Sequence, residues 1–201
     1  MHSLNEIVGN PEKMRSMYKL AVIMSKGRLM TPAHLLGSVQ DCFSIILLAT
    51  RLNIDPFNLA NQTYSIKGKI GYTGQLINAL AMNSGAIDGS FKYEYKSWNN
   101  GNGWIRCGAR LKGEDETTFG EWLDTSTVTV KNSPVWKSNP KQQSAYLVVR
   151  NFVRLYAPSV LMGMYTADEL RTIEPDTQER DVTPIAELLE AKEENLYQRV
   201  A

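Results

Sequence analysis

Apolar residues recur three and four positions apart near the start of the chain, which is the spacing of an amphipathic helix. This spacing predicts a helix over residues 11–26, ended by Gly27. A second helix is expected over residues 31–52, because Thr31 is a good N-cap and proline follows it. Its middle is apolar on nearly all sides, which predicts burial. Gly37 inside it indicates close packing, since glycine costs about 1 kcal/mol relative to alanine in a helix.

A different pattern follows the second helix. Residues 63–72 read as a β-hairpin, with β-branched and aromatic residues on both sides of a glycine turn. The tip of this hairpin carries Lys67 and Lys69, which are therefore displayed on a protruding turn. Thr73 suits the N-cap of a short helix that stops near Gly85.

Three later segments have the alternation or the composition of strands: residues 91–96, 104–111 and 125–130. The Gly/Asn-rich residues 100–103 predict a plain hairpin turn between the first two. The chain thus runs through helices, a hairpin, a helix, strands and a further helix. This order predicts an α+β fold with a mainly antiparallel sheet and a protruding hairpin packed against helices.

The stretch from Trp136 to Tyr156 combines a predicted helix with charge of a single sign. Asn139 and the proline after it form a helix start, and one face of the helix is polar except for Leu147. Free N–H groups in its first turn favour an anion such as phosphate. A core helix with a solvated back would show a similar pattern. Every charged residue between Thr125 and Ala167 is positive: Lys131, Lys137, Lys141, Arg150 and Arg154.

The net charge of +1 does not indicate a partner, but the distribution of charge does. Acidic residues dominate from Asp168 onward. We therefore expect a domain over residues 1–173 and an acidic tail over residues 174–201, in which apolar spacing allows a short helix. A basic body with an acidic tail points toward nucleic acid.

The sequence offers no recognisable catalytic chemistry. Its two histidines form no nucleophile–base pair, and it contains neither a P-loop nor a GxGxxG motif, so no enzyme activity and no cofactor are expected. The two cysteines are isolated and no CxxC occurs, which favours reduced thiols over a disulfide or a metal site. There is no signal-peptide pattern, and the apolar run at residues 42–49 is too short to span a bilayer. A cytoplasmic protein without a membrane partner is expected.

Binding is the function that remains, and the distribution of charge points to nucleic acid as the ligand. Basic residues occur on the hairpin, on one face of the strand at residues 104–111, and around the basic helix. If these elements converge, they form a groove that follows phosphates, and nearby aromatic residues could stack with bases at about 1–3 kcal/mol each. Two alternatives remain. The aromatic residues could instead pack in the core, and the basic face of the strand could simply be exposed to solvent. The predicted DNA-binding residues are Lys67, Lys69, Arg106, Arg110, Lys137, Lys141, Arg150 and Arg154.

Several motifs carry a resemblance to a known family over about residues 30–171. One is Leu52-Asn53-Ile54-Asp55-Pro56-Phe57, followed by Gln62-Thr63-Tyr64-Ser65-Ile66. The others are Pro134-Val135-Trp136-Lys137-Ser138-Asn139-Pro140-Lys141, then Arg154, then Gly163-Met164-Tyr165-Thr166-Ala167-Asp168-Glu169-Leu170. In their order and spacing these motifs are similar to those of the RecT/Redβ family of phage single-strand annealing proteins.

The resemblance implies ATP-independent binding of single-stranded DNA and annealing of complementary strands into a duplex held by the protein. It also implies homo-oligomeric rings or filaments in the host bacterial cytoplasm. Members usually work beside a 5′–3′ exonuclease, and a host single-strand-binding protein is a further expected partner. Lys141 and Arg154 match basic positions of the family motifs, and Lys67 or Lys69 matches a basic residue near the hairpin.

Three departures from the family pattern stand out. Asn139 replaces a common histidine. Leu147 replaces the lysine of some members, and this second departure predicts weaker DNA contact or a subunit contact at Leu147. The chain is also shorter at its C-terminal end than typical members, which weakens the expectation that this tail recruits the exonuclease or the host protein.

A virion or scaffold assembly protein is the alternative function, with the acidic tail and the Thr-rich strand serving subunit contacts.

Overall fold

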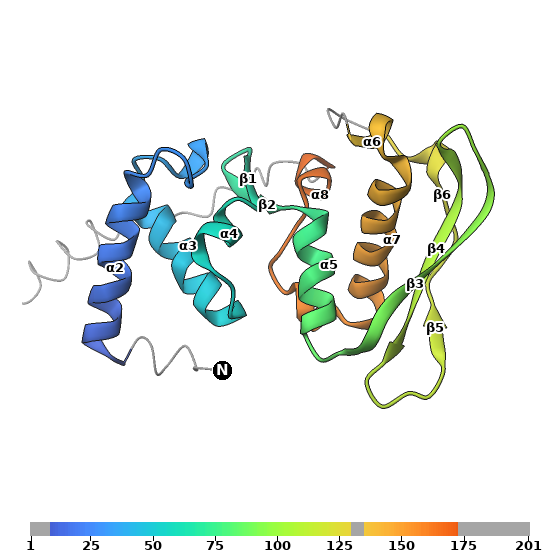
Figure 1. Ribbon diagram of the computed structural model, residues 1–201, viewed down its shortest axis with the longest axis horizontal. Helices are drawn as coiled ribbons and strands as arrows, with labels where there is room; N and C mark the ends of the chain where they lie inside the picture. The colour runs from blue at the N-terminus through green and yellow to red at the C-terminus, as the bar shows by residue number, and fades with distance from the viewer. Residues whose placement is uncertain (1–8, 130–134, 173–201) are drawn as a thin grey trace, which may run out of the picture.

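A computed structural model describes residues 9–129 and 135–172 of the chain (Figure 1). The predicted linker and helix of the acidic tail lie outside the described residues. Within the described part, seven α-helices, an antiparallel four-stranded sheet and a separate hairpin make a mixed α+β fold. The predicted fold class is therefore confirmed.

The N-terminal part is helical, but its second helix begins later than the sequence predicts. Ser38, not Thr31, caps that helix by accepting a hydrogen bond from the backbone N–H of Asp41. Thr31 instead donates to the backbone carbonyl of Met24. Gly37 has a φ of +79° and precedes the helix, and a Cβ there would meet nothing within 4 Å, so the expected close packing was wrong. The elements are α2 (Pro11–Ser25), η1 (Ala33–Leu35), α3 (Val39–Leu52) and α4 (Pro56–Ala60).

The predicted hairpin is confirmed as β1 (Thr63–Ile66) and β2 (Lys69–Tyr72). Lys67 and Gly68 form its turn with φ values of 50° and 72°, the two positive angles of a type I′ turn. The hairpin does not join the main sheet. Its last residue instead donates a backbone hydrogen bond to the carbonyl of Tyr165, which ties it to the C-terminal elements.

The helix α5 (Gly74–Asn83) follows directly and is capped by Thr73, as predicted. A Cβ at Gly74 would lie 3.0 Å from the Cβ of Tyr146. The absence of a side chain at this position therefore lets α5 begin close against the basic helix.

The main sheet is antiparallel, with strand order β3-β4-β5 and β6 also paired with β4. The predicted turn at Asn100 and Gly101 joins β3 to β4. The predicted strand at residues 125–130 was wrong at its start, where Thr125 to Thr127 form a 3-10 helix, η2. The Thr125 hydroxyl donates to the carbonyl of Gly103 and accepts from its N–H, which fixes this turn against β4. The strands are β3 (Ile87–Asn99), β4 (Asn102–Leu111), β5 (Thr117–Phe119) and β6 (Leu123–Asp124).

The basic helix of the sequence analysis is α7 (Pro140–Tyr156), capped by the Asn139 side chain as predicted. It packs against β4 on one side and against α5 on another (Figure 1). The short elements around it are α6 (Val135–Ser138), η3 (Pro158–Leu161) and α8 (Ala167–Thr172).

Two hydrophobic clusters form the core, and α5 contributes to both. One joins the N-terminal helices to the hairpin, and the other joins the sheet to α7 and η3. Leu76 and Leu80 of α5 belong to the first cluster, whereas Ile77 and Ala81 belong to the second. The hairpin, α5, α7 and α8 meet between these two cores.

Candidate nucleic-acid interface

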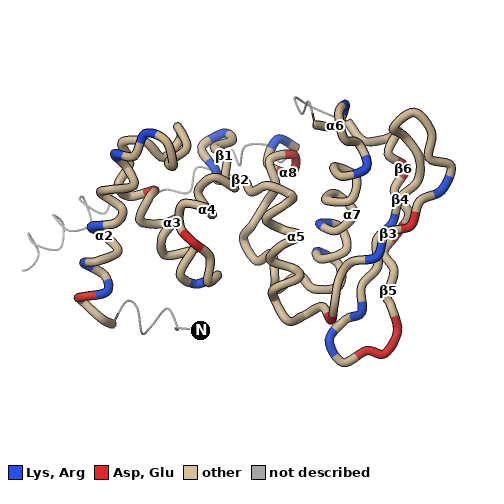
Figure 2. The backbone as a smooth tube through the Cα atoms, in the orientation of Figure 1, with Lys and Arg blue, Asp and Glu red and all other residues tan. Residues whose placement is uncertain are grey.

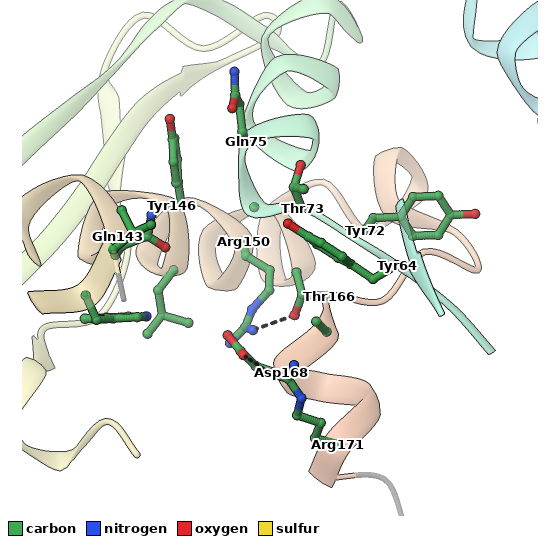
Figure 3. Close-up of a pocket in the computed structure, with 15 residues that line it drawn as sticks. Tyr64, Tyr72, Thr73, Gln75, Gln143, Tyr146, Arg150, Thr166, Asp168 and Arg171 are labelled. Atoms are coloured by element: carbon green, nitrogen blue, oxygen red, sulfur yellow. Dashed lines mark hydrogen bonds and ion pairs between the residues drawn. The ribbon is translucent and has the colours of Figure 1, made fainter. Parts of the chain in front are cut away.

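An open pocket of about 390 Å³ lies where the hairpin, α5, α6, α7 and α8 meet (Figure 3). Its volume falls in the range of about 300–1,000 Å³ that is usual for ligand sites. Four aromatic residues and two arginines contribute to its lining: Tyr64, Tyr72, Trp136, Tyr146, Arg150 and Arg171.

The hairpin supplies one wall of the pocket. Tyr64 of β1 is about half exposed, and in Figure 3 its ring extends toward Arg150 and Thr166. Residues paired across an antiparallel hairpin point to the same face, so Lys69, the partner of Ile66, shares the face of Tyr64. Lys67 is the first residue of the turn, and both lysines are exposed. The hairpin therefore places an aromatic ring beside the pocket and two cations at its tip.

The helix α7 supplies the opposite wall through residues three, four and seven positions apart. Gln143, Tyr146, Leu147 and Arg150 all line the pocket, so this wall is the predicted polar face of the helix. Leu147, the apolar residue on that face, is half-buried in the pocket wall.

Beneath the pocket, one carboxylate holds both helix arginines. Arg154 donates from Nη2 to Glu169 Oε2 at 2.9 Å, and its Nε donates to the other carboxylate oxygen. The Arg150 Nε lies 3.8 Å from Glu169 Oε1, and its Nη1 donates to the Thr166 hydroxyl at 2.9 Å. The Thr166 backbone N–H donates to Glu169 as well, at 2.7 Å. Glu169 is thus the centre of a clamp that joins α7 to α8.

The environment of Glu169 changes its acidity. Burial acts to raise the pKa of this carboxyl group, but hydrogen bonds from Arg154 and Thr166 and the charge of Arg150 outweigh it, so the pKa is lowered. Arg154 also donates to the carbonyl of Met164 at 2.7 Å and stacks on the ring of Tyr165. Both arginines therefore have internal partners that the sequence analysis did not assign.

We predict that this clamp makes stability depend on pH. Because the folded-state pKa of Glu169 is depressed, its contribution is present above its ordinary pKa of 4.5 and is lost as pH falls through the folded-state value. E169Q should lower the free energy of unfolding by about 1–2 kcal/mol at pH 7. The difference from wild type should shrink below pH 4.5 in urea titrations. A constant difference from pH 7 to pH 3 would contradict the clamp.

The two arginines of β4 lie away from the pocket. Ile105, Cys107 and Ala109 are buried toward α7, so Arg106 and Arg110 point to the other face of the sheet. On that face Arg106 forms a 2.7 Å salt bridge with Glu94 and stacks on Phe119 and Trp122. Arg110 is exposed, 4.0 Å from Asp88. The structure therefore separates these two predicted residues from those around the pocket.

Lys137 and Lys141 occupy the N-terminal end of the basic helix. Lys137 is exposed in α6, next to the pocket residue Trp136. Lys141 is exposed in the first turn of α7, with its Nζ 5.1 Å from the ring of Tyr95 and 5.7 Å from that of Trp98. Lys141 thus faces the end of β3, while Lys137 remains beside the pocket.

Sequence reasoning missed the role of Glu169 because it counted this residue only among the acidic residues that dominate from Asp168 onward. The available signals were local. Arg150 and Arg154 are one turn apart on α7, and Thr166 with Glu169 three residues later has the pattern of a capping box. A capping carboxylate close to two arginines is a natural partner for both.

Among residues 9–129 and 135–172, no group of three or more His, Cys, Asp or Glu residues is placed to hold a metal ion. Cys42 and Cys107 are buried free thiols, and burial raises the pKa of Cys107 to about 12. No helix in that part of the chain is long and apolar enough to cross a membrane.

Fold and pocket together describe an α+β protein with an open pocket that aromatic residues line and that elements with exposed lysines surround. Residues 19–184 match the model of the RecT family, so the chain belongs to that family. No curated protein matches the chain. RecT proteins are non-catalytic and anneal single strands in DNA recombination, and this chain is therefore a single-strand annealing protein. The resemblance seen in the motifs is confirmed.

Proposed function

We propose that single-stranded DNA is bound across the pocket, between the hairpin and the N-terminal end of α7. The observation that carries this proposal is the pocket itself, which is lined by aromatic residues and bordered by elements that bear exposed lysines. In Figure 2 the basic residues of the hairpin turn, α8 and α6 lie along one edge of the molecule. Bound strands anneal without ATP or another cofactor, because annealing needs only charge neutralisation and alignment.

The eight predicted DNA-binding residues then fall into groups with different geometry. Lys67, Lys69 and Lys137 are exposed cations on elements that border the pocket, and they are the best placed to meet phosphates. Lys141 extends this basic edge toward the end of β3. Arg150 lines the pocket and Arg154 lies behind it, so both contribute mainly by shaping the site. Arg106 and Arg110 would contact the phosphates of a DNA strand that passes over the face of the sheet opposite α7.

Homo-oligomerisation into a ring or filament is part of the same proposal. Exposed apolar side chains occur near η1, where Leu29 is 96% exposed, and after α7, where Met162 is 75% exposed. These two places lie in segments that are far apart in the chain. Contact between unlike surfaces of successive copies generates rings or open filaments. Many weak sites aligned along one strand then give high avidity.

The remaining expectations concern the cellular setting. We propose that the protein acts in the host bacterial cytoplasm beside a 5′–3′ exonuclease that exposes single strands. A host single-strand-binding protein would also bind those single strands and would compete with this protein for them. Both the single strands and the annealed duplex are ligands of the oligomer in this scheme.

The decisive experiment follows the pairing of two complementary oligonucleotides by fluorescence, without ATP. The protein is expected to raise the annealing rate at least about tenfold over the spontaneous rate, because aligned strands meet at a high effective concentration. Light scattering should show that complementary strands change the size of the assembly. Annealing no faster than the protein-free reaction, at protein concentrations that bind both strands, would refute the proposal.

A further inference from the structure

The pocket has the chemistry of a site for a flat ring. Tyr64, Trp136 and Tyr146 line it from three different elements, β1, α6 and α7, whereas the ring of the buried Tyr72 points away from it (Figure 3). Tyr64 is half exposed at the pocket wall, so one of its ring faces can be covered by a ligand. Gln75 and Gln143 add amide groups, which can donate to or accept from the edge of a base.

The charges inside the pocket are already balanced by the protein. Arg150 is largely buried and is held by Thr166 and Glu169. Arg171 lies 3.5 Å from the carboxylate of Asp168, which itself lines the pocket. A phosphate placed here would meet a carboxylate and two arginines with internal partners. The pocket therefore disfavours phosphate more than it disfavours an uncharged ring.

Leu147 strengthens this distinction. It lies in the α7 wall, between the pocket residues Gln143 and Arg150, and presents an apolar side chain to the cavity. An apolar wall packs well against a base, but it offers neither a charge nor a hydrogen bond to a phosphate.

We propose that this pocket takes one nucleobase from each bound stretch of single-stranded DNA. The base turns inward against Tyr64, while phosphates of the same strand stay outside on the exposed lysines of the hairpin and α6. This inference rests on the proposed function. It adds that a fraction of the bases is held by the protein and is withheld from pairing until the second strand arrives.

The test compares two fluorescent probes of equal length, an oligothymidylate and the same backbone with abasic residues. Tyr64→Ala is expected to weaken binding of oligothymidylate about tenfold, equal to about 1.4 kcal/mol and within the usual effect of base–aromatic stacking. Tyr64→Phe should bind like wild type because it keeps the ring. The salt dependence of binding should not change, since no phosphate contact is removed.

The abasic probe separates base binding from other roles of Tyr64. Wild type and Tyr64→Ala should bind it equally, because it has no base to stack. Tyr18→Ala is the matched control, since this tyrosine of α2 is similarly exposed, at 56% against 48% for Tyr64, and lies outside the pocket. Equal weakening of both probes by Tyr64→Ala, or no weakening of either, would overturn the base pocket. Failure of wild type to bind oligothymidylate at all would instead overturn the proposed function.

Discussion

Replacement of Arg154 by alanine is expected to lower the free energy of unfolding by about 3 kcal/mol, because it leaves the half-buried carboxylate of Glu169 without its main partner. The same change removes the donor to the Met164 carbonyl. Arg154→Lys keeps the charge but loses the two-pronged contact, so a smaller loss of about 1 kcal/mol is expected. Urea denaturation of the three proteins at pH 7 measures both differences.

A paired variant tests whether the loss comes from the clamp. In Arg154→Leu/Glu169→Leu both charges are removed, so the double variant should lose clearly less stability than the sum of the single ones. Additive losses would show that the two side chains do not act together. If Arg154→Ala is as stable as wild type but binds DNA poorly, the arginine contacts DNA and the clamp assignment is wrong.

Local sequence signals predicted the elements well wherever a cap or a turn fixed them. Asn139 with Pro140, Thr73, and the lysine–glycine turn of the hairpin all mark their element boundaries in the structure as they do in the sequence. The second helix was misplaced because Thr31 and Ser38 both suit a helix cap. Between them lie the 3-10 turn η1, extended backbone at Leu36 and the positive φ of Gly37, and a sequence does not display dihedral angles.

Long-range pairing explains the other errors in the fold. The short strands β5 and β6 exist because they pair with β4, and neither has an alternating pattern long enough to detect. Thr125 looked like the start of a strand by composition, but its hydroxyl bonds to Gly103, 22 residues away. This long-range contact outweighs the weak intrinsic preference of threonine for β-strands.

The candidate site was predictable in its parts but not in its assembly. The sequence indicated the hairpin lysines, the polar face of α7 and a set of aromatic candidates. It did not show that β4 buries Ile105 and Cys107 against α7, which sends Arg106 to the opposite face. Nor did it show that the carboxylate of Glu169 accepts hydrogen bonds from Arg154, which lies 15 residues earlier in the chain. The first fact depends on how α7 packs on the sheet and the second on how α8 packs on α7, and local patterns alone do not determine either packing.

The hairpin turn allows charge to be removed without weakening the fold. In the variant Lys67→Asn/Lys69→Gln, the turn becomes Asn-Gly, the preferred sequence for a type I′ turn, so stability should be unchanged or slightly higher. Two phosphate contacts are lost. The slope of log K against log salt for single-stranded DNA should therefore fall in magnitude by about 1.4, from about 0.7 for each contact.

This change in slope sets the size of the effect on affinity. If the two proteins bind equally at about 1 M salt, the variant should bind about 25-fold more weakly than wild type at about 0.1 M salt. Lys13→Ala/Lys19→Ala is the matched control, because it removes the same charge from exposed positions of α2, away from the pocket. Equal loss of affinity in the two double variants would mean that net charge alone governs binding. Only a selective loss at the hairpin turn places the DNA strand beside the pocket.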